Sequence, residues 1–208
     1  MTRKIALWAL CLTLLLPLSA LADSYQVSVG YADGLRGAGF FPNPWQGDSG
    51  VTFDGISGAN IDDAGAIMIH NTSGAAFTVN NVTVNVSGNI FSLWGSHVVN
   101  AGDYLILTET AYYNFDTSDF NNQGCGVNNG DIPTVAVTVD GITTSFNDTG
   151  QVLNTSGYDF ACQGNESFQW RPIGGAGGPA GTPEPSTLIL MGTGGLGLLG
   201  SLKKRFAN

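Results

Sequence analysis

Two histidines are the first candidates for chemistry, because an imidazole gains and loses its proton near neutral pH. They are His70 and His97, each beside a strand-like run, and Ser96 directly precedes the second one. A serine, a histidine and one of the many aspartates could form a nucleophilic triad. No Gly-x-Ser-x-Gly elbow or other recognisable nucleophile context accompanies them. The sequence therefore predicts histidines at turn edges or on a sheet surface, and a protein that is not an enzyme.

Carboxylates are the second group of candidates. Asp62 adjoins Asp63, and Asp116 lies close to Asp119 along the chain. Glycoside hydrolysis needs two carboxyls about 5–9.5 Å apart across a cleft, a distance that a sequence does not show. The run that starts at Asp119 begins like a calcium-binding EF-hand loop, but Gly130 stands where that loop needs a bidentate Glu. No cofactor is predicted, apart from a looser candidate calcium site made of Asp116, Asp119, Asn121 and Asp131.

Aromatic residues form the third group, and they support a ligand hypothesis. The prolines of residues 40–45 exclude a central strand and place Trp45 in a loop, while Tyr112 and Tyr113 belong to a second aromatic cluster in a polar stretch. Exposed rings beside Asn and Asp can stack on sugar faces while the polar groups bind hydroxyls. In the alternative interpretation, these rings cover the ends of a hydrophobic core.

The elements that position these residues are short strands. Apolar residues alternate with polar ones in residues 25–31, 82–86 and 135–139, the pattern of a half-buried strand. Asp140-Gly141 joins the third run to residues 142–146 and predicts a hairpin with a type I′ turn. Further β-rich runs stand at 51–53, 66–70, 90–94 and 104–108. We therefore expect an all-β fold, a single β-sandwich over residues 23–173, with an immunoglobulin-like topology first and a jelly roll second.

The N-terminus predicts export from the cytoplasm. Two basic residues, Arg3 and Lys4, precede an apolar run over 5–18, and Ala20-Leu21-Ala22 has the small-x-small pattern of a cleavage site. These are the three parts of a secretory signal peptide, so residues 1–22 should be removed by signal peptidase.

The C-terminus mirrors this arrangement. A Gly-rich flexible linker over 174–181 leads to an apolar stretch, 186–202, that ends in a basic cluster. As a helix this stretch would span about 25 Å, less than a hydrocarbon core of about 30 Å. Basic residues stay on the cytoplasmic side, so the domain between the two ends lies outside the cytoplasm. The basic cluster consists of Lys203, Lys204 and Arg205.

Pro183, Glu184 and Pro185, followed by the short apolar helix and the basic terminus, resemble the PEP-CTERM sorting signal of Gram-negative bacteria. The resemblance covers residues 182–208. It implies transient anchoring in the inner membrane through the C-terminal helix, then recognition and removal by an exosortase-like protease. It also implies a place in the cell envelope, on the outer surface or in the extracellular matrix, in cells that commonly secrete exopolysaccharide.

Two cysteines stay in the mature protein, Cys125 and Cys162. An even number in an oxidising compartment predicts one disulfide. Closing a loop of about 37 residues would stabilise the fold by roughly 3–4 kcal/mol in the chain-entropy model.

The charge of the domain excludes one class of partner. Residues 23–181 contain fifteen Asp and Glu, two Arg and no Lys. Such an acidic surface repels phosphate backbones, so no nucleic acid is expected as a partner. We therefore expect a non-enzymatic envelope or extracellular-matrix protein. The alternative is a carbohydrate-binding module for exopolysaccharide, and the second alternative is a secreted glycan hydrolase; exposed aromatic rings would favour binding, buried ones a structural role.

Overall fold

The computed structural model describes residues 25–35, 38–56, 63–120, 127–159 and 165–176. All of them belong to one compact unit, residues 23–178. The predicted signal peptide, the sorting tail and both Cys125 and Cys162 lie outside the described residues. Within the described ranges, no helix is long and apolar enough to cross a membrane, and the predicted membrane segment 186–202 falls outside them.

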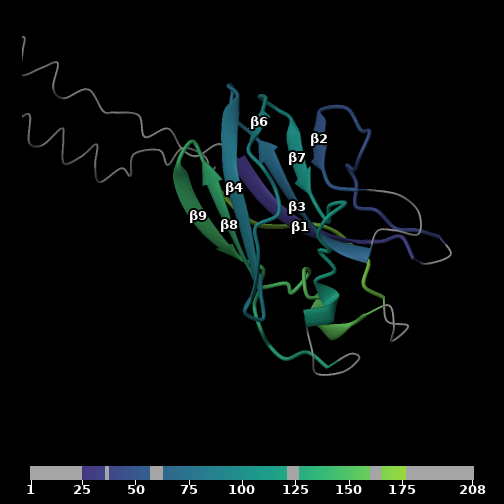
Figure 1. Cartoon of the computed structure of the whole chain (residues 1–208). Coiled ribbons are helices and arrows are strands. Elements are labelled where there is room, and N and C mark those ends of the chain that lie inside the picture. Colours follow the sequence, from purple (N-terminus) through teal and green to yellow (C-terminus); the bar gives the residue numbers. More distant parts are fainter. Residues whose placement is uncertain (1–24, 36–37, 57–62, 121–126, 160–164, 177–208) are drawn as a thin grey trace, which may run out of the picture. The chain divides into compact units, whose positions relative to one another are not determined.

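In the part of the chain that the structure describes, ten strands form two sheets, which confirms the all-β prediction (Figure 1). The first sheet has the order β10-β1-β3-β7-β2, and its strands are β10 (Phe168–Ala176), β1 (Tyr25–Asp33), β3 (Asp63–Asn71), β7 (Tyr104–Leu107) and β2 (Val51–Asp54). The second has the order β5-β4-β8-β9, with β6 also paired to β4, and its strands are β5 (Asn89–Phe91), β4 (Phe77–Val86), β8 (Thr134–Val139), β9 (Ile142–Asn147) and β6 (His97–Val99). Every strand pair is antiparallel except β2 with β7. Two 3₁₀ turns, Ser118–Phe120 and Thr155–Gly157, complete the described elements.

One hydrophobic core lies between the two sheets. Val27 and Val29 of β1 contribute to it from the first sheet, and Val82 and Val84 of β4 from the second, all at 0–1 % exposure. They occupy alternate positions because successive side chains of a strand point to opposite faces. The two sheets thus form a sandwich, and the choice between an immunoglobulin-like and a jelly-roll topology stays a prediction.

The predicted hairpin between β8 and β9 is confirmed. Val139 pairs with Ile142 at its end, and Asp140 and Gly141 take φ angles of 48° and 83°. Positive φ at both central residues defines the type I′ turn, whose twist matches that of the strands. The Asp140 carboxylate also accepts a hydrogen bond from the backbone N–H of Thr78 at 2.9 Å, which ties the turn to β4.

The prediction of a half-buried first strand is wrong for β1, because both faces of this strand are buried. Ser28, expected on the solvent face, is only 2 % exposed. A second apolar cluster covers the outer face of the first sheet, with Ala32, Ala66 and Ile106 from the sheet and Trp45 from the 38–50 loop. Alternation in a sequence shows one apolar face; it does not show that a distant loop covers the other.

The predicted linker begins later than residue 174. Strand β10 continues to Ala176, and Gly174 and Gly175 pair with Val27 and Gln26 of β1. A side chain at Gly174 would overlap the ring of Phe146 on β9, so glycine allows this close contact between the edges of the two sheets.

Candidate functional site

Trp45 is buried, and its burial removes it from the ligand hypothesis. Its side chain is 8 % exposed. The ring centroid lies 5.2 Å from that of Phe53, 5.9 Å from Phe41 and 5.9 Å from Trp170. Such aromatic pairs bury large apolar areas and stabilise the fold. The structure favours the alternative interpretation, in which this ring covers apolar core surface.

Hydrogen bonds hold the loop around Trp45 in place. The backbone N–H of Trp45 donates to Asp48 Oδ2 at 2.8 Å, and Trp170 Nε1 donates to the carbonyl oxygen of Pro44 at 2.9 Å. Asn43 N donates to Gln169 Oε1 at 3.0 Å. The residues directly before the buried indole are therefore fixed to β10, and Asp48 closes the loop after it.

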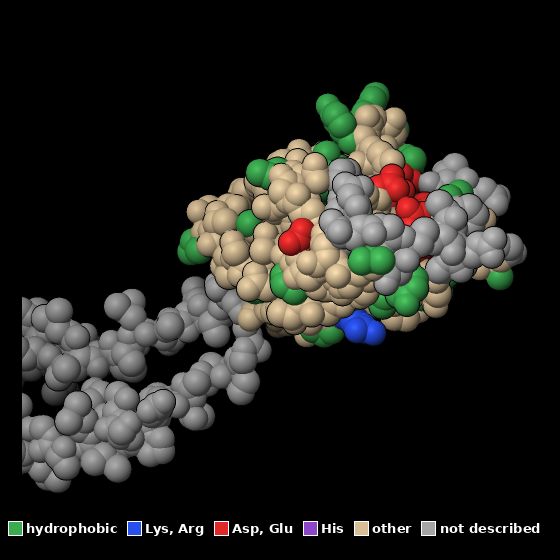
Figure 2. All heavy atoms as spheres, turned by 90° about the horizontal axis from the view of Figure 1, so that it is seen from below, with side chains coloured by type: hydrophobic (Ala, Val, Ile, Leu, Met, Phe, Trp, Pro, Cys, Tyr) green, Lys and Arg blue, Asp and Glu red, His purple; other side chains and the backbone are tan. Residues whose placement is uncertain are grey.

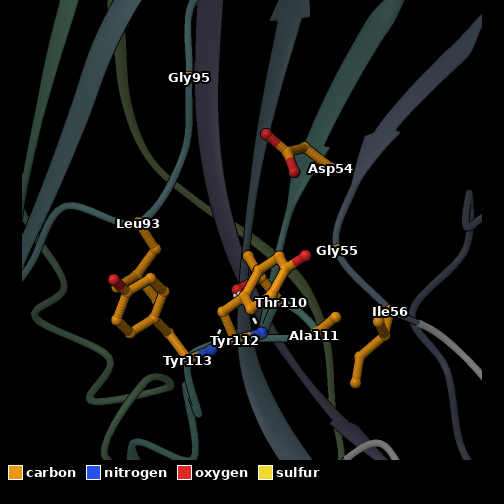
Figure 3. A pocket seen from close by; sticks show the side chains of 9 residues that line it. All are labelled: Asp54, Gly55, Ile56, Leu93, Gly95, Thr110, Ala111, Tyr112 and Tyr113. Carbon is orange, nitrogen blue, oxygen red and sulfur yellow. Dashed lines mark hydrogen bonds between the residues drawn. The ribbon is translucent and has the colours of Figure 1, made fainter.

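Tyr112 and Tyr113, in contrast to Trp45, are exposed to solvent. Their side chains are 89 % and 60 % exposed, among the most exposed large apolar side chains in the described residues. A tight turn presents them: Thr110 N donates to the carbonyl oxygen of Tyr113 at 3.0 Å, and Thr110 Oγ1 accepts from Tyr113 N at 3.1 Å. Figure 3 shows the two rings pointing in different directions from this turn.

A pocket of about 340 Å³ lies beside these rings (Figure 3). Three segments form it: the end of β2, the connection from β5 to β6, and the tyrosine turn. Its lining residues are Asp54, Gly55, Ile56, Leu93, Gly95, Thr110, Ala111, Tyr112 and Tyr113. The sequence indicated the two tyrosines but missed Asp54 and Leu93, because nothing local shows that the end of β2 meets the tyrosine turn.

Gly55 allows the chain to pass at the edge of this pocket. A Cβ atom there would overlap the side-chain methyl of Thr108 and lie 2.9 Å from the carbonyl oxygen of Glu109. That carbonyl accepts a hydrogen bond from the N–H of Ile56 at 2.8 Å, so the segment after β2 runs close against the segment after β7.

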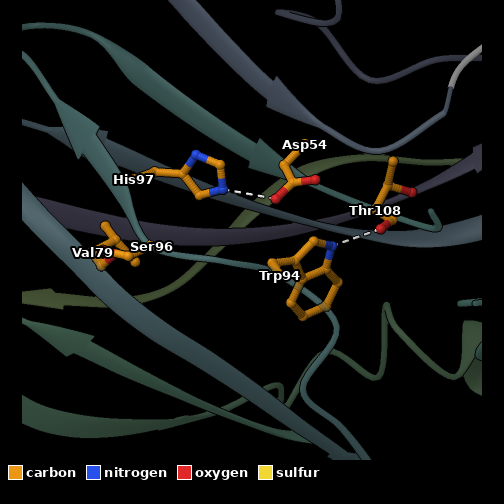
Figure 4. A network of polar contacts seen from close by, with 6 residues as sticks. All are labelled: Asp54, Val79, Trp94, Ser96, His97 and Thr108. Atoms are coloured by element: carbon orange, nitrogen blue, oxygen red, sulfur yellow. Dashed lines mark hydrogen bonds and ion pairs between the residues drawn. The ribbon is translucent and has the colours of Figure 1, made fainter.

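Asp54, which lines the pocket, contacts His97, so two of the three members of a possible triad meet here. His97 Nε2 lies 2.7 Å from Asp54 Oδ2, and both side chains are partly exposed. The hydroxyl of Ser96, however, donates to the carbonyl oxygen of Val79 at 3.1 Å. Figure 4 shows Ser96 beside Val79, and the interaction drawn from the imidazole goes to Asp54. The geometry does not activate this serine, because a nucleophile must lie within hydrogen-bond reach of its base.

Trp94 fixes the connection that carries Leu93, Ser96 and His97. The indole is 6 % exposed, and its Nε1 donates to the carbonyl oxygen of Thr108 at 2.7 Å (Figure 4). Its ring packs edge-on against Phe115 with the centroids 5.0 Å apart. The hydrogen bond ties the connection between β5 and β6 to the residue that follows β7.

Of the candidate calcium ligands that the structure describes, Asp116 and Asp131 have different hydrogen-bond partners. Asp116 Oδ1 accepts hydrogen bonds from Tyr31 Oη at 2.8 Å and from Ser118 Oγ at 2.7 Å. Asp131 instead accepts from Asn129 at 3.0 Å and lines a different pocket of about 210 Å³, beside the β4–β5 turn. In the ranges that the structure describes, no three His, Cys, Asp or Glu side chains are placed to hold a metal, and Asn121 lies outside them.

The predicted disulfide cannot be placed, since both cysteines lie outside the described residues. Burial has the largest effect on the pKa of Asp119, and the charges of Asp116 and Asp159 raise this pKa further. Cys125 follows Asp119, and Cys162 follows Asp159. The Cys125–Cys162 disulfide stays a prediction.

The surface is poor in basic groups, as the sequence indicated. Arg171 is the one Lys or Arg among the described residues. On the face drawn in Figure 2, acidic side chains (red) lie beside apolar ones (green). A ligand of this surface is therefore expected to be neutral or cationic rather than polyanionic.

The comparison with family models identifies the tail. Residues 182–205 match the family described as the PEP-CTERM protein-sorting motif. No curated protein and no solved structure matches the chain. The chain is thus an exported, cell-envelope-associated β-protein. It carries a PEP-CTERM sorting signal, which implies membrane anchoring followed by exosortase processing.

Proposed function

We propose that this protein is a non-enzymatic component of the outer surface or extracellular matrix of a Gram-negative bacterium, and that it binds exopolysaccharide there. The observation that carries the proposal is the pair of exposed rings, Tyr112 and Tyr113, at the edge of a pocket of about 340 Å³. Exposed aromatic rings on a rigid scaffold are the usual means of binding sugar rings, because the apolar ring face and the polar rim act together.

The polar groups of the rim complement the rings. The Asp54 carboxylate, oriented by His97, can accept hydrogen bonds from sugar hydroxyls, and the tyrosine hydroxyls can donate or accept them. The tyrosine turn is held by the Thr110 hydroxyl, so little conformational freedom is lost when a ligand binds. Several such sites on one matrix polymer would raise the avidity of a weak single contact.

The absence of catalysis is part of the proposal. It is supported by the Ser96 hydroxyl, which binds the Val79 carbonyl oxygen instead of the His97 imidazole. A secreted glycan hydrolase would need a second carboxyl across the pocket, and Asp54 is the one Asp or Glu among its lining residues.

Affinity electrophoresis tests the binding site. The processed protein should migrate more slowly in gels that contain exopolysaccharide from the producing cell, and the double variant Tyr112→Ala/Tyr113→Ala should abolish this retardation. Tyr158→Ala is the matched control, because Tyr158 is also exposed, at 46 %, but does not line the pocket. Equal retardation of the double variant and the wild type would reject the site.

The fate of the tail is the second part of the proposal. We expect cleavage near Pro183-Glu184-Pro185, which would release the domain from the membrane. C-terminal mass spectrometry of the surface-located protein should therefore find no peptide that contains Asn208, and Glu184→Ala should leave full-length protein in the inner membrane. Recovery of Asn208 on the mature surface protein would instead identify the tail as a permanent anchor.

A further inference from the structure

Four carboxyl groups meet at one end of the first sheet. Asp33 ends β1 and Asp63 begins β3, and the two are direct register partners. Glu166 precedes β10, and Asp116 lies in the chain after β7. The Tyr31 hydroxyl donates to Asp116 at 2.8 Å, and the charge of Asp116 acts on Asp63. Like charges directly opposite on neighbouring strands destabilise a sheet, so this arrangement needs compensation.

Within this carboxyl cluster, Glu166 is the group whose burial needs the most compensation. Its side chain is 0 % exposed, and neither carboxyl oxygen accepts a hydrogen bond from an N–H or O–H group of the described residues. A buried carboxylate without a partner is costly. No described basic side chain compensates it, because the one candidate, Arg171, places its guanidinium over the Phe168 ring at 5.3 Å.

A cation or a proton could neutralise the carboxyl cluster, and the structure favours the proton. Within the described residues, no three acidic side chains are placed to hold a metal. Glu166 and Asp63 are close enough for each to affect the ionisation of the other. Two neighbouring buried carboxyl groups avoid charge repulsion when one of them is protonated and can donate to the other.

The titration of the pair agrees with this geometry. The pKa of Glu166 is raised from 4.5 to about 9. Burial is the largest cause, and the charges of Asp63 and Asp33 follow. The pKa of Asp63 is raised from 3.8 to about 6. Burial is the largest cause, the charge of Asp116 comes next, and the charge of Asp33 raises the pKa further. A carboxyl whose pKa is higher in the folded state stabilises the fold fully below its unfolded pKa. This contribution is lost as the pH rises through the folded pKa. The carboxyl cluster should thus lose stability progressively between about pH 4 and pH 9.

We propose that the carboxyl cluster is a proton-dependent latch, which holds the start of β10 against β1 and β3 and releases it when the surroundings become alkaline. The strand order explains why β10 responds. It is an edge strand that pairs with β1 alone, and Glu166 directly precedes it. Deprotonation places additional buried charge beside Asp33 and Asp63 at the point where β10 begins. Because β10 also covers Trp45 through Trp170, its release would expose the outer apolar cluster.

Thermal unfolding across pH tests the latch. The melting temperature of the processed protein should fall by several degrees between pH 5 and pH 9 at constant ionic strength, and Glu166→Gln should remove most of that fall, since an amide keeps a donor and cannot ionise. Glu109→Gln is the matched control: Glu109 is also buried, at 9 %, but does not belong to the carboxyl cluster, so this variant should keep the wild-type pH dependence.

Two results would overturn the latch. One is a Glu166→Gln variant with the same pH dependence as the wild type. The other is a calcium-dependent rise in melting temperature at pH 8 that Glu166→Gln abolishes, which would make the carboxyl cluster a cation site. If the variant does not fold, ¹³C NMR of wild-type carboxyl groups decides: the latch requires a glutamate that titrates well above its ordinary range, and its absence contradicts the latch.

Discussion

Two aromatic segments of the domain, residues 40–45 and 112–115, have similar compositions and opposite environments. In the first segment, the Trp45 side chain is 8 % exposed because its ring packs against Phe53 and Trp170. In the second, Tyr112 is 89 % exposed. The difference comes from the surface beneath each segment. The 38–50 loop crosses the outer face of the first sheet, where small residues such as Ala66 leave room for an indole; the tyrosine turn extends past the end of β7.

The same contrast occurs within the second segment. Phe115, close to the two tyrosines in the sequence, is 0 % exposed. Its ring packs edge-on against Phe91 at 5.1 Å and against Trp94 at 5.0 Å. An aromatic cluster in a polar stretch can therefore supply both a core anchor and a candidate binding surface, and the anchor fixes the position of the exposed rings.

The largest expected effect is that of Trp45→Ala. Removal of a buried Trp should lower the free energy of unfolding by about 3–5 kcal/mol, because it leaves a cavity among three rings. Denaturant titration measures this loss. Exopolysaccharide retardation should be unchanged under conditions in which the variant is folded. A loss below about 1 kcal/mol would show that the 38–50 loop does not stabilise the sheet.

Gly55→Ala should have the next largest effect, because the added methyl group overlaps Thr108. Overpacking of this kind costs about 1–3 kcal/mol. Gly95→Ala is the control, since Gly95 also lines the pocket but a Cβ there meets nothing within 4 Å. Equal melting temperatures for the two variants would contradict the close approach of the chain segments at this pocket.

Trp170→Phe should have a smaller effect, specific to the buried segment. It keeps a ring against Trp45 but removes the hydrogen bond to the Pro44 carbonyl, worth about 0.5–1.5 kcal/mol. We expect faster proteolytic cleavage within the 38–50 loop and little change in binding. The opposite result, an intact loop with weakened binding, would connect Trp170 to the ligand site.

The smallest effect on stability is expected for Thr110→Val, at the exposed segment. The substitution removes the hydroxyl that accepts from the N–H groups of Tyr112 and Tyr113, and it should change the free energy of unfolding by less than about 0.5 kcal/mol. Retardation by exopolysaccharide should nevertheless weaken, because the rings lose their fixed orientation. Thr110→Ser keeps the hydroxyl and should restore binding. Unweakened binding by the valine variant would argue against a preorganised turn.

Features that depend on local pattern could be predicted from the residues alone. Alternating apolar residues predicted the strands, and Asp140-Gly141 predicted the hairpin, because period and turn chemistry are local properties. The tail around Pro183-Glu184-Pro185 predicted the sorting signal, because a processing enzyme reads a short linear motif. The two tyrosines of the candidate site were also predicted, as an aromatic cluster in a polar stretch.

Which of these residues meet depends on how the strands pack in three dimensions. It buried Trp45 beneath β10 and left Tyr112 exposed, and it brought Asp54 to the tyrosine turn. It also placed Glu166 beside Asp63, although about half of the chain separates them. The physical reason is that burial and pKa depend on the groups that pack against a side chain. In a sandwich those groups come from strands far apart in the sequence, where local alternation carries no information about them.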